Sequence, residues 1–179
     1  MFDRIESLFR QSSKLKIDYW LAHDLFGVHW WFIVIVNLIS LIFLFIFIDR
    51  KRFQLILIAF LVSFTVISYV NELGHFYGFW SYPHQFLAFF QSFNSVDFAV
   101  IPVIITLIYQ YFNKWSIYMI VTIVMSAILG FIAVPIFVHF DLYKLQNWNS
   151  FYSFLTLVVS GCLVKILVDF IKMKSQQHA

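Results

Sequence analysis

Two titratable side chains, Glu72 and His75, stand three residues apart near the end of a long apolar run. On a helix this spacing turns both side chains to one face. Di-metal helix bundles bridged by carboxylates use the same Glu and His spacing twice in one chain, whereas this chain has it once. Asn71 lies beside the pair, so a polar patch interrupts the apolar stretch. We interpret this patch as a candidate intramembrane polar site.

A second candidate is Asp97, which lies within another apolar segment that begins near residue 86. On a helix, Asp97 would lie roughly 16 Å along that segment, close to the middle of a bilayer. A lone carboxylate there is costly unless it is paired or neutralised, so Asp97 is a functional candidate and we assign it to the same polar site. The alternative is a protonated Asp97 that bonds a neighbouring helix together with Asn94, one turn before it.

Metal binding is a third interpretation of the same residues, with Glu72 and His75 as the first two ligands. Further ligands would have to come from four residues outside the pair: His84, His139, Asp141 and His23. None of these residues stands at a diagnostic ligand spacing. The alternative is that the histidines are ordinary interfacial residues, polar at one end and packed at the other. The sequence requires no cofactor.

The composition indicates which elements must position these residues. Of the 179 residues, 62% are hydrophobic and 12% are charged, and the mean hydropathy is +0.86. Soluble domains have about 45–50% apolar and 25% charged residues. The sequence therefore predicts an all-α, polytopic membrane helical bundle. The net charge of +3 fits basic loops of a membrane protein and gives no reason to expect nucleic acid as a partner.

Runs of about 20 apolar residues, the length that crosses a bilayer as helix, predict five transmembrane helices. They are residues 29–48, 54–73, 86–112, 116–140 and 150–171, which together make a transmembrane domain over 29–171. Pro102 and Pro135 fall inside two of these runs, where they predict kinks. An amphipathic segment over 1–28 is expected to lie as a helix in the membrane interface, with a partly ordered polar tail as the alternative. Residues 172–179 are expected to form a basic C-terminal tail.

Five crossings place the N-terminal segment, the second loop and the fourth loop on one side of the membrane. Five tryptophans belong to this side: Trp20, Trp30, Trp31, Trp80 and Trp148. The basic first loop, Arg50 to Arg52, belongs to the other side. Basic residues near the ends of the spans favour an external N-terminus and an internal C-terminus.

Four short motifs resemble a family of small, functionally uncharacterised polytopic membrane proteins of spore-forming Gram-positive bacteria. They are DRKRF at 49–53, FWSY at 79–82, the spacing from Asp97 to Pro102, and NWNSFYSF at 147–154. The resemblance covers about the last two-thirds of the chain. It implies a multi-pass protein of the bacterial cytoplasmic membrane and brings no known reaction with it.

Three functions from different classes follow from these features. In the first, the polar site handles a proton, a cation or a small solute in transport. A homo-oligomer is expected for this transport function, because five short helices leave little room for a pore. In the second, a non-catalytic accessory protein packs a partner protein or lipid in the bilayer, and its polar groups join helices. The third is a metal-dependent membrane enzyme acting on a lipid-soluble substrate. The chain has no glycine-rich phosphate loop, no GxSxG and no HExxH, so a non-enzymatic protein is favoured.

Overall fold

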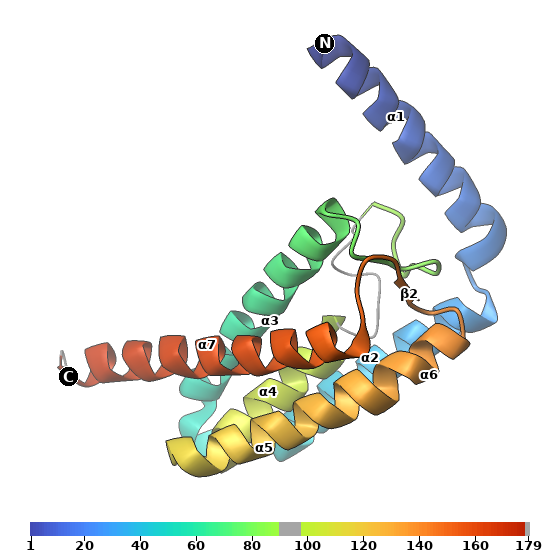
Figure 1. Cartoon of the computed structure of the whole chain (residues 1–179). Helices are drawn as coiled ribbons and strands as arrows, with labels where there is room; N and C mark the ends of the chain where they lie inside the picture. Colours follow the sequence, from blue (N-terminus) through green and yellow to red (C-terminus); the bar gives the residue numbers. More distant parts are fainter. Residues whose placement is uncertain (90–97, 178–179) are drawn as a thin grey trace.

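The computed structural model describes residues 1–89 and 98–177, and nearly all of the regular structure in them is helical (Figure 1). The helices and short helical turns are α1 (Phe2–Tyr19), η1 (Trp20–Asp24), α2 (Val28–Phe47), η2 (Arg50–Arg52), α3 (Phe53–Phe76), α4 (Val100–Tyr111), α5 (Trp115–Ile128), η4 (Leu129–Ala133), α6 (Val134–His139) and α7 (Ser150–Gln177). Two two-residue strands, β1 (Trp80–Ser81) and β2 (Lys144–Leu145), pair antiparallel. The predicted all-α class is confirmed.

Within residues 1–89 and 98–177, four helical stretches are long and apolar enough to cross a membrane, which is compatible with a multi-pass membrane protein. They are Val28–Phe47, Arg50–Phe76, Trp115–His139 and Ser150–Gln177. Three of them begin or end within a few residues of the predicted boundaries. The last continues as helix to Gln177, so the segment expected as a separate basic tail from residue 172 is the end of α7.

The predicted third span, residues 86–112, is wrong in its first part. Residues 86–89 are not helical, and the helix α4 begins only at Val100. Its 12 residues extend about 18 Å at 1.5 Å per residue, roughly half of a bilayer. Pro102 therefore lies in the first helical turn and causes no kink, because the N–H that proline lacks has no intrahelical partner there.

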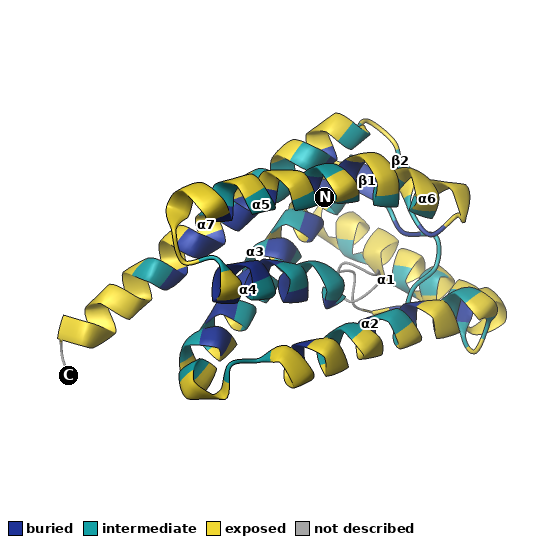
Figure 2. Ribbon diagram, turned by 90° about the horizontal axis from the view of Figure 1, so that it is seen from below, coloured by how far each residue is buried: buried dark blue, intermediate teal, exposed yellow. Residues whose placement is uncertain are grey.

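The core lies where α3 packs against α4 and α7. Its fully buried residues include Ile56 and Ala59 of α3, Tyr118 of α5, and Val164 and Val168 of α7. Figure 2 shows that most of the buried residues lie on α3, α4 and the facing side of α7, whereas the outer faces of α2 and α5 are exposed. In Figure 1, α1 projects away from the other helices, and none of its residues is buried.

One end of the molecule is organised by the basic loop between α2 and α3. The Asp49 carboxylate accepts a hydrogen bond from Arg52 Nε at 2.7 Å and another from the Lys51 N–H. The Arg52 guanidinium holds the pKa of the Asp49 carboxyl below its ordinary value. Gln110 of α4 accepts from the Asp49 N–H and donates to the Phe47 carbonyl, so the C-terminal end of α4 is joined to this loop.

The opposite end joins three segments that are far apart in the sequence. The pairing of β1 with β2 places Trp80 opposite Leu145. The indole N–H of Trp20 donates to the Gln85 carbonyl, and that of Trp30 donates to the Phe86 carbonyl. The N-terminal segment, the connection after α3 and the connection before α7 therefore meet at one end of the molecule, which is the grouping that the sequence predicted.

Candidate functional site

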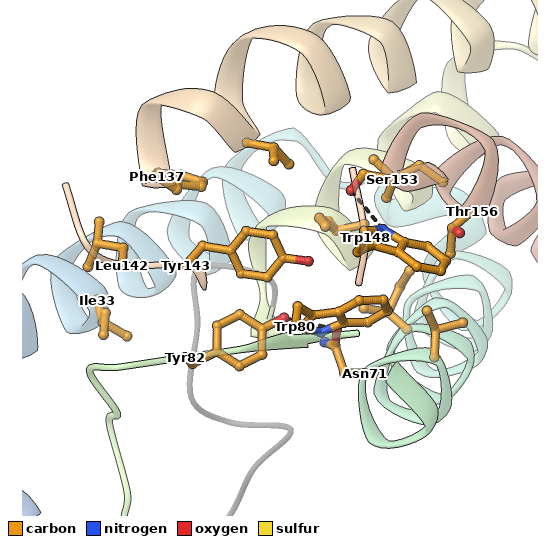
Figure 3. Close-up of a pocket in the computed structure, with 15 residues that line it drawn as sticks. Ile33, Asn71, Trp80, Tyr82, Phe137, Leu142, Tyr143, Trp148, Ser153 and Thr156 are labelled. Carbon is orange, nitrogen blue, oxygen red and sulfur yellow. Dashed lines mark hydrogen bonds between the residues drawn. The ribbon is translucent and has the colours of Figure 1, made fainter. Parts of the chain in front are cut away.

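A cavity of about 80 Å³ lies beneath this junction of three segments (Figure 3). It lies within a wider hollow of about 720 Å³ that includes space open to the surroundings. Helices α2, α3, α4, α6 and α7 and both connections contribute to its lining: Ile33, Ile67, Val70, Asn71, Trp80, Tyr82, Ile101, Val134, Phe137, Leu142, Tyr143, Trp148, Ser153, Thr156 and Leu157. The site is thus assembled from nearly the whole chain.

One wall of the cavity is built on the last turns of α3. Asn71 and Gly74 stand three residues apart on the buried face of the helix. The Trp80 ring packs directly on Gly74, where a Cβ atom would overlap it. The Tyr82 hydroxyl donates to Asn71 Oδ1 at 3.0 Å. Because Gly74 has no side chain and the side chain of Asn71 is short, β1 and the residues after it pack closely against the helix.

The opposite wall comes from the connection before α7 and from the start of that helix. Trp148 Nε1 donates to Ser153 Oγ at 3.1 Å. The ring of Trp148 contacts that of Trp80 edge to face, with centroids 5.0 Å apart, and the rings of Tyr82 and Tyr143 lie 5.3 Å apart. Figure 3 shows Trp80 and Tyr82 on one side of the cavity and Tyr143 and Trp148 on the other. Aromatic pairs thus join the two walls.

The lining is apolar and aromatic, with a few neutral polar groups. No charged residue and no histidine is among the described residues that line the cavity. Trp80 is 5% exposed, and its indole N–H has no hydrogen-bond partner among the described residues. Leaving a buried donor unpaired costs about 1–3 kcal/mol. A cavity of this kind suits a neutral, largely apolar molecule that carries a hydrogen-bond acceptor.

The predicted polar patch is divided between two faces of α3. Asn71 is buried and lines the cavity, whereas Glu72 is exposed and His75 is half-buried. Glu72 lies on a different face from Asn71 and Gly74, because successive helical residues are turned by about 100° and these two residues occupy the buried face. Glu72 and His75 do not line the cavity.

The remaining members of that site, Asn94 and Asp97, lie outside the described residues. Their expected approach to Glu72 and His75 therefore stays a prediction. Asn37 of α2, another polar residue in an apolar helix, is buried and accepts a hydrogen bond from the Ala99 N–H at 2.9 Å. It joins α2 to the start of α4.

A different titratable cluster forms where the N-terminal segment meets the chain after β1. His84 Nδ1 lies 2.7 Å from Asp24 Oδ1, and the Gln85 N–H donates to Asp24 Oδ2 at 3.1 Å. The rings of His84 and His29 stack with centroids 3.9 Å apart and an interplanar angle of 3°. The other residues suggested as ligands, His23, His139 and Asp141, are all exposed.

A metal centre finds no support in this geometry. Within residues 1–89 and 98–177, no group of three or more His, Cys, Asp or Glu side chains could hold a metal ion. Asp141 pairs instead with Lys144, at 3.5 Å. His84 hydrogen-bonds Asp24, and the rings of His23, His29 and His139 contact other rings.

At the far end of the molecule, Lys165 is buried, at 2% exposure. Its ammonium group lies 3.3 Å from Asp169 Oδ2, donates to the Asn113 carbonyl and lies 4.9–5.2 Å from the centroids of three aromatic rings, those of Tyr109, Trp115 and Tyr118. The spacing of four residues predicts the ion pair, since such residues are neighbours on a helix. Cation–π contacts stabilise the charge inside the protein, so this lysine does not extend toward the surface.

The sequence indicated where the cavity lies better than it indicated which residues line it. The stretch from Asn71 to His84 attracts attention through its titratable groups, yet the cavity uses Asn71, Trp80 and Tyr82 from it. Gly74 was a further signal, because a glycine near the end of an apolar helix allows close packing of a ring. Asp24 carried no local signal, since its partners are about 60 residues away in the sequence.

The chain matches no protein-family model, no curated protein and no solved structure. The function is therefore argued from the geometry of the site.

Proposed function

We propose that this chain is a non-catalytic, multi-pass membrane protein that holds a neutral, lipid-soluble molecule in the cavity between α3 and α7. The observation that carries the proposal is the lining: fifteen residues from all over the chain surround the space, and none of them is charged. A charged headgroup would find no counter-charge there, whereas an apolar body would be bound by aromatic and aliphatic walls.

The unpaired indole N–H of Trp80 supports a ligand with an oxygen acceptor. An ester or ketone oxygen that reaches this wall would pair with the donor. At about 80 Å³ the cavity is smaller than the roughly 150 Å³ cavity that takes up benzene in an engineered protein. It therefore accommodates one end of a lipid molecule, and the remainder lies along the helices in the bilayer.

Five membrane crossings are part of the proposal. The chain leaves α3 at the cavity end, where Trp80 pairs with Leu145, and Gln110 joins the end of α4 to the basic loop at the other end. The chain therefore passes from one end of the molecule to the other between α3 and α5. This supports a crossing between α3 and α5 that ends with α4.

The positions of the basic residues support an orientation in the membrane, and the motif resemblance supports a type of membrane. Arg50 to Arg52 and the lysines near the end of α7 favour the cytoplasmic side, which places the cavity end outside. The motif resemblance favours the bacterial cytoplasmic membrane. The helix α1 exposes Phe2, Ile5, Leu8 and Phe9. We assign it to the headgroup region on the external face of the cytoplasmic membrane, where such side chains are buried among headgroups.

Transport through Glu72, His75 and Asp97 is the alternative function. It stays a prediction, because Asp97 lies outside the described residues. The exposed position of Glu72 favours the cavity over this polar patch as the functional site.

Photocrosslinking tests the ligand-binding function. The protein is reconstituted in nanodiscs with a diacylglycerol that carries a diazirine on one acyl chain, close to the ester group. We expect adducts on the peptides that line the cavity, and we expect unlabelled diacylglycerol to compete for them. Thr156→Phe fills the cavity from α7 and should abolish these adducts. Thr65→Phe, on an exposed face of α3, is the matched control and should retain them.

Adducts spread evenly over the exposed helix faces, without competition and equal in both variants, would contradict the proposal. They would show that the lipid only surrounds the helices as solvent does.

A further inference from the structure

The residues from Trp80 to Phe86, here named the strap, connect the cavity wall to the N-terminal segment. At one end of the strap, Trp80 and Tyr82 line the cavity. At the other end, the carbonyls of Gln85 and Phe86 accept hydrogen bonds from Trp20 and Trp30. Because seven residues contain both sets of contacts, a change in how the strap is held also changes the wall of the cavity.

Asp24 of the N-terminal segment holds the strap through hydrogen bonds to its carboxylate. Its side chain is 1% exposed, and its two oxygens accept from different strap residues, one from His84 and one from the Gln85 N–H. A buried carboxylate is costly unless its charge is paired and its lone pairs are satisfied. A proton on His84 would turn this contact into an ion pair and make the hydrogen bond charge-assisted.

His29 is the third member of the cluster. Its ring lies parallel to that of His84, with centroids 3.9 Å apart. One charged and one neutral imidazole stack favourably, because the charge is attracted to the neutral ring. Two imidazolium rings at this separation would repel each other. The geometry of the cluster therefore suits a single positive charge beside the Asp24 carboxylate.

Other charged groups face the same region from α1 and η1. A groove of about 780 Å³ runs between these elements and the strap, and Asp24 and Gln85 line it together with Lys16, Asp18 and His23. Lys16 and Asp18 carry opposite charges, and His23 is exposed, with its ring tilted against that of Tyr19. None of these three has a hydrogen bond or ion pair to His84 or Asp24 among the described residues. The cluster itself therefore dominates the response to pH.

We propose that Asp24, His84 and His29 form a proton-binding site, and that one bound proton holds the strap closed over the cavity. Histidine is the side chain whose charge ordinarily changes between about pH 5 and 8. The strap is most tightly held where the cluster contains one proton, loosens as that proton leaves at higher pH, and loosens again at lower pH when both rings are charged. Control of ligand entry by this proton rests on the proposed ligand-binding function, whereas proton binding itself does not.

Hydrogen exchange of the ligand-free protein in micelles tests the proton-binding site. After correction for the intrinsic pH dependence of exchange, residues 77–89 should exchange more slowly at about pH 6 than at about pH 8. The expected difference is about fivefold, the factor that separates a neutral from a charge-assisted hydrogen bond. Exchange within α7 serves as the internal reference for the folded state.

Three variants separate the roles of the residues. His84→Gln can still donate to Asp24 and cannot gain a charge, so the difference between the two pH values should vanish while α7 stays protected. His29→Phe keeps a ring in the stack and should retain the difference, but it should lose the faster exchange at acidic pH. His139→Gln changes an exposed histidine outside the cluster and should behave as the wild type. Exchange that is independent of pH in the wild type, or the same pH dependence in His84→Gln, would overturn the proposal.

The link to the cavity is tested separately by the diacylglycerol crosslink. Its yield at the cavity should follow the exchange rate of the strap across the same pH range in the wild type, and it should be constant in His84→Gln. A pH-dependent strap without any cavity crosslink would refute the ligand-binding function alone. A crosslink without a pH-dependent strap would refute the proton-binding site alone.

Discussion

At the scale of single residues, the site depends on a few side chains whose size or hydrogen bonding lets distant segments meet. Gly74 leaves room for the Trp80 ring, Asn71 accepts from Tyr82, and Asp24 accepts from two residues of the strap. These contacts involve short or absent side chains on one partner and a ring or backbone group on the other. Small changes at these positions should therefore have large effects.

Gly74→Ala is expected to destabilise the protein, although alanine favours helix by about 1 kcal/mol over glycine. The added methyl group would overlap the Trp80 ring, so the ring and the strap must move. Overpacking of this kind costs about 1–3 kcal/mol. Thermal unfolding in micelles, followed by tryptophan fluorescence, measures the change. Leu73→Ala, at an exposed neighbouring position, is the control, and a Gly74→Ala protein as stable as the wild type would contradict the packing of Trp80.

At the scale of elements, α4 differs from the helix that hydropathy predicts. The apolar segment is long enough for a whole span, and in its described residues the α-helix occupies Val100–Tyr111. Its beginning is joined to α2 by the Asn37 side chain, and its end is joined to the basic loop by Gln110. The Arg52 guanidinium also donates to the Gln110 carbonyl. A neighbouring side chain thus satisfies a backbone group at each end of α4, as a helix end away from water requires.

Asn37→Leu should loosen the start of α4. The variant removes the acceptor of the Ala99 N–H, and losing such a partner at a helix start costs about 1–2 kcal/mol. Hydrogen exchange of residues 98–111 should rise, while exchange of α7 is unchanged.

Two further variants test whether the lost hydrogen-bond acceptor causes the faster exchange. Asn37→Asp keeps an oxygen acceptor at this position and should protect α4 better than the leucine does. Ser40→Ala removes a hydroxyl that bonds only within α2, to the Val36 carbonyl, and should have no effect on α4. Equal exchange of residues 98–111 in the wild type and in Asn37→Leu would rule out the capping role.

At the scale of the whole molecule, the chain is chemically two-sided. The basic loop, Gln110 and the buried Lys165 lie toward one end. The strap, the β1–β2 pair and the tryptophans other than Trp115 lie at the other. The cavity belongs to the second end. If the chain crosses the membrane as proposed, ligand and proton reach the site from the outer side.

Cysteine labelling tests this arrangement in a Cys162→Ala background. Lys144→Cys lies beside the strap and should react in intact cells with a maleimide that does not cross membranes. Lys51→Cys and Lys114→Cys lie at the opposite end and should react only after the cells are opened. If Lys51→Cys and Lys114→Cys label from different sides, the number of crossings between them is wrong.

The amino-acid sequence by itself determined the helical class, four long apolar helices and the grouping of segments at each end. Continuous apolar runs bounded by charged and aromatic residues are sufficient for this, because helix length in a bilayer follows from composition. The stretch from Asn71 to His84, which has polar and titratable residues within an apolar chain, also indicated where a site would lie. The ion pair of Lys165 with Asp169 followed from their spacing, since both lie on one helix.

Only the tertiary structure decided which side of each helix faces inward. Helices that are apolar all round lack the polar stripe that would indicate their rotation, so Asn71 and Glu72 could not be separated from sequence. Their rotation follows from the packing of Trp80 on Gly74. The contacts of Asp24 with His84 and of β1 with β2 join residues about 60 positions apart, and no local pattern encodes such pairs. The cavity and the proton-binding cluster both arise from these long-range contacts.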